Sequence, residues 1–249
     1  MANTHSLDLE LSSNQYASIA DASQTGLDIT GDISVECWVK IESQPGDGTE
    51  YTFASKWNGT GNQRSWQFGY SRSGATYYIY TYISGTGSWQ GSPATAQTLT
   101  NGIWYHVAFT WKALTSEHKL YLNGGLLDTQ TSTATALYNS SAAFVVGARG
   151  DTGGPHDGLI DDIRIWNDVR TADEIETNFH LELTGTETNL VAYWKFNNDY
   201  LDETSNNNDL TASGSPVFST DYAFESVVAT TNYLKYYRRT RFPGSITGI

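Results

Sequence analysis

The stretch GLIDDIRIWNDVRTADEI (158–175) is more informative about the fold than any other part of the sequence. Its first half alternates apolar and polar side chains with a period of two, which is typical of a β-strand. Thr171 and Glu174 then have the spacing of a capping box, in which each side chain satisfies a free backbone N–H of the other residue. The stretch therefore predicts a strand followed by a short helix near residues 172–178.

The same alternation recurs elsewhere in the chain. It is clearest in ISVECWVK (33–40) and GIWYHVAFTW (102–111), and Asn123-Gly124 is a hairpin turn signal. Gly, Ser, Thr and Asn are abundant between such runs and helical periodicity is nearly absent, which favours an all-β sandwich or barrel. We expect roughly 12–14 strands. The predicted core includes Val35, Cys37, Val39, Val107, Phe109, Ile163, Ile165 and Trp194.

The composition excludes several classes of protein. The chain has 249 residues, and 14 basic against 27 acidic side chains give a formal net charge of −13. A chain this acidic would repel phosphate, so nucleic acid is not expected as a partner. No run approaches the ~18 apolar residues of a membrane span. One cysteine excludes a disulfide within the chain, and the N-terminal MANTHSLDLE lacks the pattern of a secretory signal peptide.

A series of segments, taken in order, carries a resemblance to a known family. They are SLDLELSSNQYASIAD (6–21), ITGDISVECWVKI (29–41), FASKWN (53–58), NGIWYHVAFTW (101–111), KLYLNGGLLDT (119–129), GLIDDIRIWNDVRTADEI (158–175) and NLVAYWKFNN (189–198). The series resembles the laminin-G-like and pentraxin-like domains of the concanavalin A-like lectin/glucanase superfamily. The resemblance implies a two-sheet antiparallel jelly-roll sandwich with one short helix, which we assign to residues 1–224. Residues 225–249 lie outside the resemblance and are expected to form an extended basic C-terminal tail. It also implies non-catalytic binding of glycans, proteins or surfaces, often through calcium.

Calcium needs about six to eight oxygen ligands, and ARGDTGGPHDGLIDD (148–162) is dense in aspartate and glycine. In the pentraxin pattern, a carboxylate four residues after a strand-end glycine is a calcium ligand, and these positions resemble Asp151 and Gly147. The neighbouring Glu-Gln pair of that pattern is Arg149-Gly150 here. The alternative is that these aspartates hydrogen-bond loop amides. The candidate metal ligands are Asp151, Asp157, Asp161, Asp162 and Asn62.

Asp161 is a special case among these candidates. By strand alternation it shares a face with Ile163 and Ile165, so it is expected to point into the core. A buried carboxylate needs a cation or several hydrogen-bond donors. A second oxygen-rich loop, LDETSNNNDLT (201–211), is either another metal site or a turn-rich connection to the closing strand.

Exposed aromatic and amide side chains would mark a glycan site, because sugars stack their apolar faces on rings and present hydroxyls to polar groups. The segments KWNGTGNQRSW (56–66) and SGTGSWQG (84–91) place tryptophans among Gly and Ser, which predicts loop positions for them. Tyrosines alternate along TYYIYTYI (76–83), and such a row is a binding platform, the outer face of a sheet or a subunit contact. The candidate ligand-binding residues are Trp57, Asn58, Trp66 and Trp89.

Catalysis has little support in the sequence. Glycosidases of the same fold class carry Glu-x-Asp-x-x-Glu on one strand, because two carboxylates must flank the scissile bond, and this motif does not occur here. The five histidines have no arrangement that would support a serine nucleophile. We therefore expect a protein that is not an enzyme.

The segment TNYLKYYRRTRFPGSITGI (231–249) differs in character, because it is basic and aromatic and contains no acidic residue. On an acidic chain it predicts an arm that docks on another subunit or a particle surface, and the alternative is a loosely attached terminus. The predicted docking residues are Tyr233, Tyr236, Tyr237, Arg238, Arg239, Arg241 and Phe242.

Two functions stay open at this point. The first is a structural surface protein of a virion or filament, such as a decoration, fibre or tail component, with lectin-like adhesion to glycans or host surfaces. The second is a secreted calcium-dependent carbohydrate-binding module. The basic arm and the N-terminal sequence favour the first, which predicts an oligomer at a virion or extracellular surface.

Overall fold

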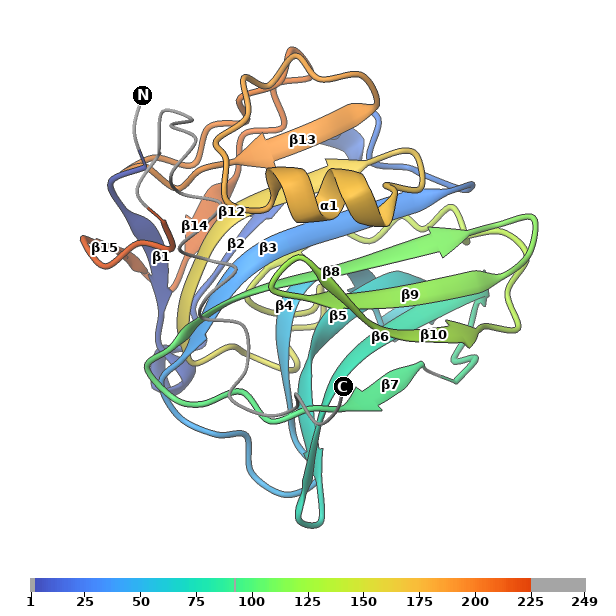
Figure 1. Ribbon diagram of the computed structural model, residues 1–249, viewed down its shortest axis with the longest axis horizontal. Coiled ribbons are helices and arrows are strands. Elements are labelled where there is room, and N and C mark those ends of the chain that lie inside the picture. Colours follow the sequence, from blue (N-terminus) through green and yellow to red (C-terminus); the bar gives the residue numbers. More distant parts are fainter. Residues whose placement is uncertain (1–2, 92, 225–249) are drawn as a thin grey trace, which may run out of the picture.

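The computed structural model describes residues 3–91 and 93–224, and this part of the chain forms two antiparallel β-sheets packed face to face (Figure 1). Its fifteen strands slightly exceed the expected number, because three-residue strands form three of the four sheet edges. Short edge strands limit unwanted pairing with other chains. The tail at 225–249, with its predicted docking residues, lies outside the described residues.

The first sheet contains eight described strands. Its order is β10 (Gly125–Thr131), β9 (Glu117–Leu122), β8 (Trp104–Lys112), β3 (Ile33–Ile41), β12 (Gly158–Trp166), β1 (Ser6–Leu9) and β15 (Val217–Ser219), with β13 (Leu190–Trp194) also paired to β12.

The second sheet contains seven described strands. Its order is β14 (Thr211–Ser213), β2 (Tyr16–Ile19), β11 (Phe144–Val146), β4 (Glu50–Asn58), β5 (Gln63–Ser73), β6 (Thr76–Gly87) and β7 (Ala94–Ala96). The helical elements are η1 (Leu11–Ser13), η2 (Asp21–Ser23), η3 (Thr60–Asn62) and α1 (Ala172–Asn178).

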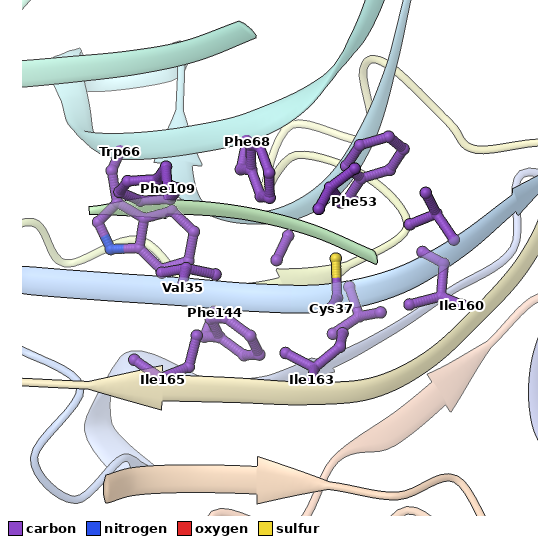
Figure 2. Packing of buried hydrophobic residues seen from close by; sticks show 14 of the residues in the cluster. Val35, Cys37, Phe53, Trp66, Phe68, Phe109, Phe144, Ile160, Ile163 and Ile165 are labelled. Carbon is purple, nitrogen blue, oxygen red and sulfur yellow. The ribbon is translucent and has the colours of Figure 1, made fainter. Parts of the chain in front are cut away.

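The core fills the space between the sheets (Figure 2). Aromatic rings from both sheets meet there: Phe68 of β5 lies 5.2 Å from Phe109 of β8, and Phe144 of β11 lies 4.8 Å from Trp194 of β13. Burial of each such side chain contributes about 1.5–3 kcal/mol. All eight predicted core residues are in this cluster, so the alternation predicted its composition correctly.

β12 departs from regular alternation at Asp161 and Asp162. Its register against β3 shifts there, and Asp162 has a φ of 49°. A β-bulge adds one residue to a strand and thereby changes which face the following residues occupy. Ile160 belongs to the core cluster, so the next residue, Asp161, lies on the opposite face, where it pairs with Trp38; Ile163 is again in the core. The expectation that Asp161 shares the core face with Ile163 is therefore wrong.

A buried arginine ties the outer face of the first sheet to α1. The guanidinium of Arg164 lies 2.5 Å from the Asp162 carboxylate and 3.6 Å from that of Glu36. It also donates to the backbone carbonyls of Asn178 (3.0 Å) and Leu181 (2.5 Å), just where α1 ends. The predicted helix and its capping box are confirmed, and the arginine fixes the helix C-terminal end on the sheet.

Asp161 joins both ends of the described chain. Its fully buried carboxylate accepts from the Asn3 side chain (2.8 Å) and from the backbone N–H of Ala223 (3.0 Å). The next residue, Phe224, packs against Trp38 of β3 at 5.8 Å between ring centroids. The segment before residue 225 is thus docked on the outer face of the first sheet.

Candidate functional site

An open groove of about 890 Å³ lies against the second sheet, on the side that faces away from the core. It starts where β4 begins and β5 ends, is bounded by the loops at 43–49 and 149–155, and reaches the segment after β6. We call it the Trp89 groove. Its polar and aromatic lining includes Glu50, Arg72, Tyr82, Trp89 and Arg149.

Three aromatic rings meet at one end of the groove. The ring of Trp89 lies 4.5 Å from that of Tyr82 and 6.1 Å from that of Trp57, and both contacts are edge-to-face. Trp57 is only 2% exposed, whereas Trp89 is 57% exposed. The buried Trp57 and the half-buried Tyr82 hold Trp89 in place while more than half of its surface stays open to solvent. Such a ring is suited to stacking against the apolar face of a sugar.

A network of charged and polar side chains lies beside these rings. Arg149 donates to the Glu50 carboxylate (2.7 Å) and to that of Asp151 (2.9 Å). Glu50 also accepts from Gln67 (3.2 Å) and from the Tyr82 hydroxyl. Burial, and then the negative charge of Glu50, raise the pKa of Tyr82, so its hydroxyl stays protonated. The groove therefore combines an exposed ring with fixed donors and acceptors.

Asp151 holds two loops together at the groove wall. Its carboxylate accepts from the backbone N–H groups of Gly59 (3.0 Å) and Gly153 (3.2 Å) in addition to Arg149. Burial alone would raise its pKa, but the Arg149 charge and these N–H groups keep the pKa below its ordinary value. A Cβ at Gly59 would lie 2.8 Å from the carboxylate, so a larger residue there would require the Asp151 side chain to shift. Asp151 thus hydrogen-bonds loop amides, which is the alternative to calcium binding that the sequence left open.

The five predicted calcium ligands do not come together. The carboxylate of Asp157 accepts from the Leu11 N–H (3.2 Å) and from the Ser43 hydroxyl. Asp161 and Asp162 lie on the outer side of the first sheet, in the contacts described above. The Asn62 side chain accepts from Arg64 at 2.8 Å. Each predicted ligand therefore has protein partners of its own, and no three of the predicted aspartates form a cluster in the described residues.

The predicted glycan-binding residues come together only in part, because Trp57 contacts Trp89 whereas Trp66 lies in the core. Trp57 and Trp66 lie in β4 and β5, so their assignment to loops is wrong, and Trp66 is 2% exposed in the core cluster. The side chain of Asn58 accepts from the Thr60 N–H (2.8 Å) and shapes the turn after β4. Trp89 is the predicted residue that the structure places in the groove. Glu50 and Arg149 were missed because residues about a hundred positions apart give no local sequence signal.

A cluster of three carboxylates, also missed by sequence, lies at the junction of two strands. The ligand oxygens of Asp8, Glu10 and Glu42 all lie within 4.8 Å of one another. They meet because β1 and β3 both pair with β12. The last residue of each of these two strands has Gly158 as its register partner. A Cβ at Gly158 would lie 2.1 Å from the Lys40 carbonyl, so glycine is needed for this approach.

The electrostatics of this cluster reflect crowding of like charges. Burial raises the pKa of Asp8, and the Glu10 and Asp157 carboxylates raise it further. The pKa of Glu42 is raised by burial and then by the same carboxylates and Asp8. The Oδ1 atom of Asp8 is buried without a hydrogen-bond partner in the described part of the chain. The cluster therefore has both excess negative charge and an unsatisfied oxygen.

The second oxygen-rich loop is a structural connection. The Asp202 carboxylate accepts from the backbone N–H groups of Tyr193 (3.0 Å), Thr204 (2.9 Å) and Asn208 (2.9 Å). Asn208 in turn bonds the backbone of Thr25. These bonds fasten the loop to β13, as the turn-rich interpretation expects.

Comparison with known proteins assigns the class. A family model described as the concanavalin A-like lectin/glucanases superfamily matches residues 11–176, and the chain belongs to this superfamily. No curated protein sequence matches the chain. Within residues 3–91 and 93–224, no helix has the length and apolar character needed to span a bilayer.

Solved structures share the fold at low sequence identity. A protein from Bacteroides ovatus, named as a carbohydrate binding protein, superposes with a TM-score of 0.70 at 16% identity, over 92% of this chain and 63% of its own. A SAP-like pentraxin from Limulus polyphemus gives 0.56 at 13% identity, over 87% and 95%. The CBM40 of the Ruminococcus gnavus IT-sialidase, bound to α2,3-sialyllactose, gives 0.55 at 17% identity, over 71% and 97%. This chain thus spans less than two thirds of the Bacteroides protein.

Proposed function

We propose that the chain is a non-catalytic carbohydrate-binding protein and that the Trp89 groove is its saccharide site. The observation that carries the proposal is the 57% exposed Trp89 ring, which packs against the buried Trp57 and the half-buried Tyr82. It lies beside the paired Glu50 and Arg149. A sugar ring can stack on the indole while its hydroxyls donate to the carboxylate and accept from the guanidinium.

The structural comparisons support the same class. The Bacteroides ovatus protein is named for carbohydrate binding, and the CBM40 structure contains a bound sialyllactose. Both share the two-sheet architecture of this chain. The binding residues proposed here come from this chain's own groove, because identities of 16–17% support likeness of fold alone.

The test is a Trp89→Ala variant screened on a panel of immobilised oligosaccharides. Loss of a stacked ring, on the order of 1.5 kcal/mol, should weaken binding roughly tenfold or more. The matched control is Leu114→Ala, an 87% exposed side chain in the turn between β8 and β9, outside the groove. Both variants should keep the melting temperature of the parent chain. Unchanged binding by Trp89→Ala would exclude the groove as the site.

A divalent cation belongs to this proposal at Asp8, Glu10 and Glu42 rather than at the predicted aspartates. Calcium prefers carboxylate oxygens, and the unpartnered buried oxygen of Asp8 fits such a ligand. A bound cation would neutralise the crowded charge and stabilise the strand ends that meet at Gly158.

Thermal melts in millimolar calcium and in chelator test this part of the proposal. Calcium should raise the melting temperature by mass action on the folded state. The Asp8→Asn and Glu42→Gln variants should lose that response and, in chelator, should melt at or above the parent temperature because repulsion is relieved. A melt that is the same in calcium and chelator contradicts the cation site.

An assembly role at a virion or extracellular surface stays a prediction from sequence, since the basic arm at 231–249 lies outside the described residues. Deletion of 231–249 tests it: particle attachment or self-association should be lost while the sandwich keeps its melting temperature.

A further inference from the structure

We infer that the Trp89 groove selects neutral saccharides and discriminates against those that carry a carboxylate, sulfate or phosphate. The inference rests on the proposed function and specifies the chemical class of its ligand. It follows from how the charged groups in and behind the groove are already paired.

One of the two arginines that line the groove, Arg149, has its charge balanced. Arg149 directs one N–H at Glu50 (2.7 Å) and its Nε–H at Asp151 (2.9 Å), so two carboxylates face one guanidinium. A guanidinium has five N–H donors, so others remain for sugar hydroxyls or ring oxygens. An anionic ligand would instead have to approach Glu50 and compete for a positive charge that is already neutralised.

The second cation is held at the other end of β6. Arg72 donates its Nε–H to the Gly74 carbonyl (2.8 Å), and its guanidinium lies over the Tyr77 ring at 5.3 Å. Tyr77 is at the start of β6, whereas Trp89 follows its end. The Asp47 carboxylate binds the N–H of the same glycine at 2.6 Å. Arg72 is thus not placed to meet an acidic group on a sugar stacked at Trp89.

The far wall of the groove is backed by acidic groups. Leu11 and Ser43 line the groove, and both donate to Asp157 behind them. An anion entering the groove therefore meets negative charge at both ends, on a chain whose net charge is −13.

A neutral saccharide fits the same set of groups. Glu50 is an acceptor for hydroxyl donors, the unused N–H groups of Arg149 are donors for sugar oxygens, and Trp89 offers the stacking surface. None of these contacts requires a charge on the ligand. The groove is complementary to a neutral sugar with adjacent hydroxyls.

The experiment measures binding of the full chain to pairs of immobilised glycans. Each neutral glycan is printed beside a counterpart with an added sialic acid, uronate or sulfate, for example lactose and α2,3-sialyllactose, in buffer containing a chelator. Each neutral ligand that binds should bind roughly tenfold or more tightly than its charged counterpart. The ratio should narrow as sodium chloride rises from about 20 mM to about 500 mM, because salt screens repulsion between exposed charges.

A Glu50→Gln variant tests the electrostatic cause. Relative to the parent chain, it should bind the charged glycans more tightly compared with the neutral ones. The control, Glu117→Gln, removes a charge from β9 of the other sheet and should leave the ratio of neutral to charged affinity unchanged. Equal or tighter binding of the charged counterparts by the parent chain at low salt overturns the inference while the proposed function stands. Binding to no member of the panel overturns the proposed function and the inference together.

Discussion

Asp161 shows how a single buried carboxyl group can join segments that are distant in sequence. Its Oδ2 atom accepts from both Asn3 and Ala223, whereas its Oδ1 atom and the Asn3 amide oxygen are buried without partners in the described structure. Burial, and then the neighbouring Asp162, raise the pKa of Asp161 well above its ordinary value. A neutral carboxyl with one O–H is the form that this environment favours.

The residue-scale prediction compares Asp161→Asn with Asp161→Ala. The asparagine variant keeps an acceptor for Ala223 and replaces the O–H by an N–H donor, so its stability should match or exceed that of the parent chain at neutral pH. The alanine variant leaves the Ala223 N–H and the Asn3 amide unsatisfied, which should cost about 1–3 kcal/mol. Urea unfolding measures both. Equal destabilisation by the two substitutions would show that the charged carboxylate is required.

At the scale of elements, alternation predicts most strands but not their irregular points. The alternate residues Val35, Cys37 and Val39 of β3 follow a regular pattern and face the core as predicted. The bulge at Asp162 reverses the face of β12, and an extra residue of this kind has no signature in a single sequence. Trp66 was placed in a loop because Gly and Ser surround it, but ladder pairing with β6 keeps it in β5. Tertiary pairing overrides local composition there.

The site was less predictable than the strands. Trp89 could be named from its own segment because an aromatic ring among Gly and Ser has no core to fill. Glu50 and Arg149 come from β4 and from the loop before β12, and only the folded sandwich brings them within 2.7 Å. The Asp8 cluster likewise depends on a register that aligns two strand ends at Gly158. Contacts between residues that are so far apart in the sequence depend on the topology of the fold rather than on the spacing of a motif.

The element-scale prediction concerns α1. The Thr171 hydroxyl accepts from the Glu174 N–H (3.2 Å), and the Glu174 carboxylate accepts from the Thr171 N–H (2.8 Å). Thr171→Ala should destabilise the protein by about 1 kcal/mol, whereas Thr171→Ser, which keeps the cap, should be nearly neutral. Chemical denaturation of the three proteins checks this. A serine variant as unstable as the alanine variant would show that the threonine methyl group, not the cap, matters.

At the scale of the whole molecule, acid sensitivity should depend in part on buried neutral histidine. His156 is fully buried between Tyr51 (5.7 Å) and Phe53 (5.6 Å), and burial lowers its pKa to about 4, with Asp157 opposing the shift. In the unfolded chain the pKa is ordinary, near 6.5. Between about pH 6.5 and 4 the unfolded state binds the extra proton, so the stability contributed by His156 is present above this window and is lost as the pH falls through it.

The whole-molecule prediction concerns how steeply the free energy of unfolding depends on pH. His156→Phe should reduce the dependence of unfolding free energy on pH by up to about 1.4 kcal/mol per pH unit within that window, whatever its effect at pH 7. Urea unfolding of parent and variant at several pH values from 4.5 to 7.5 provides the measurement. Parallel curves would mean that the pKa of His156 is the same in the folded protein as in the unfolded chain.

The central claim is that the Trp89 groove binds a saccharide, and the most direct test is a crystal structure of the full chain with the neutral oligosaccharide that binds best on the panel. We expect a sugar ring stacked on the Trp89 indole, with hydroxyl groups hydrogen-bonded to the Glu50 carboxylate and the Arg149 guanidinium. An oligosaccharide bound elsewhere on the sandwich, with the groove occupied only by solvent, would contradict it.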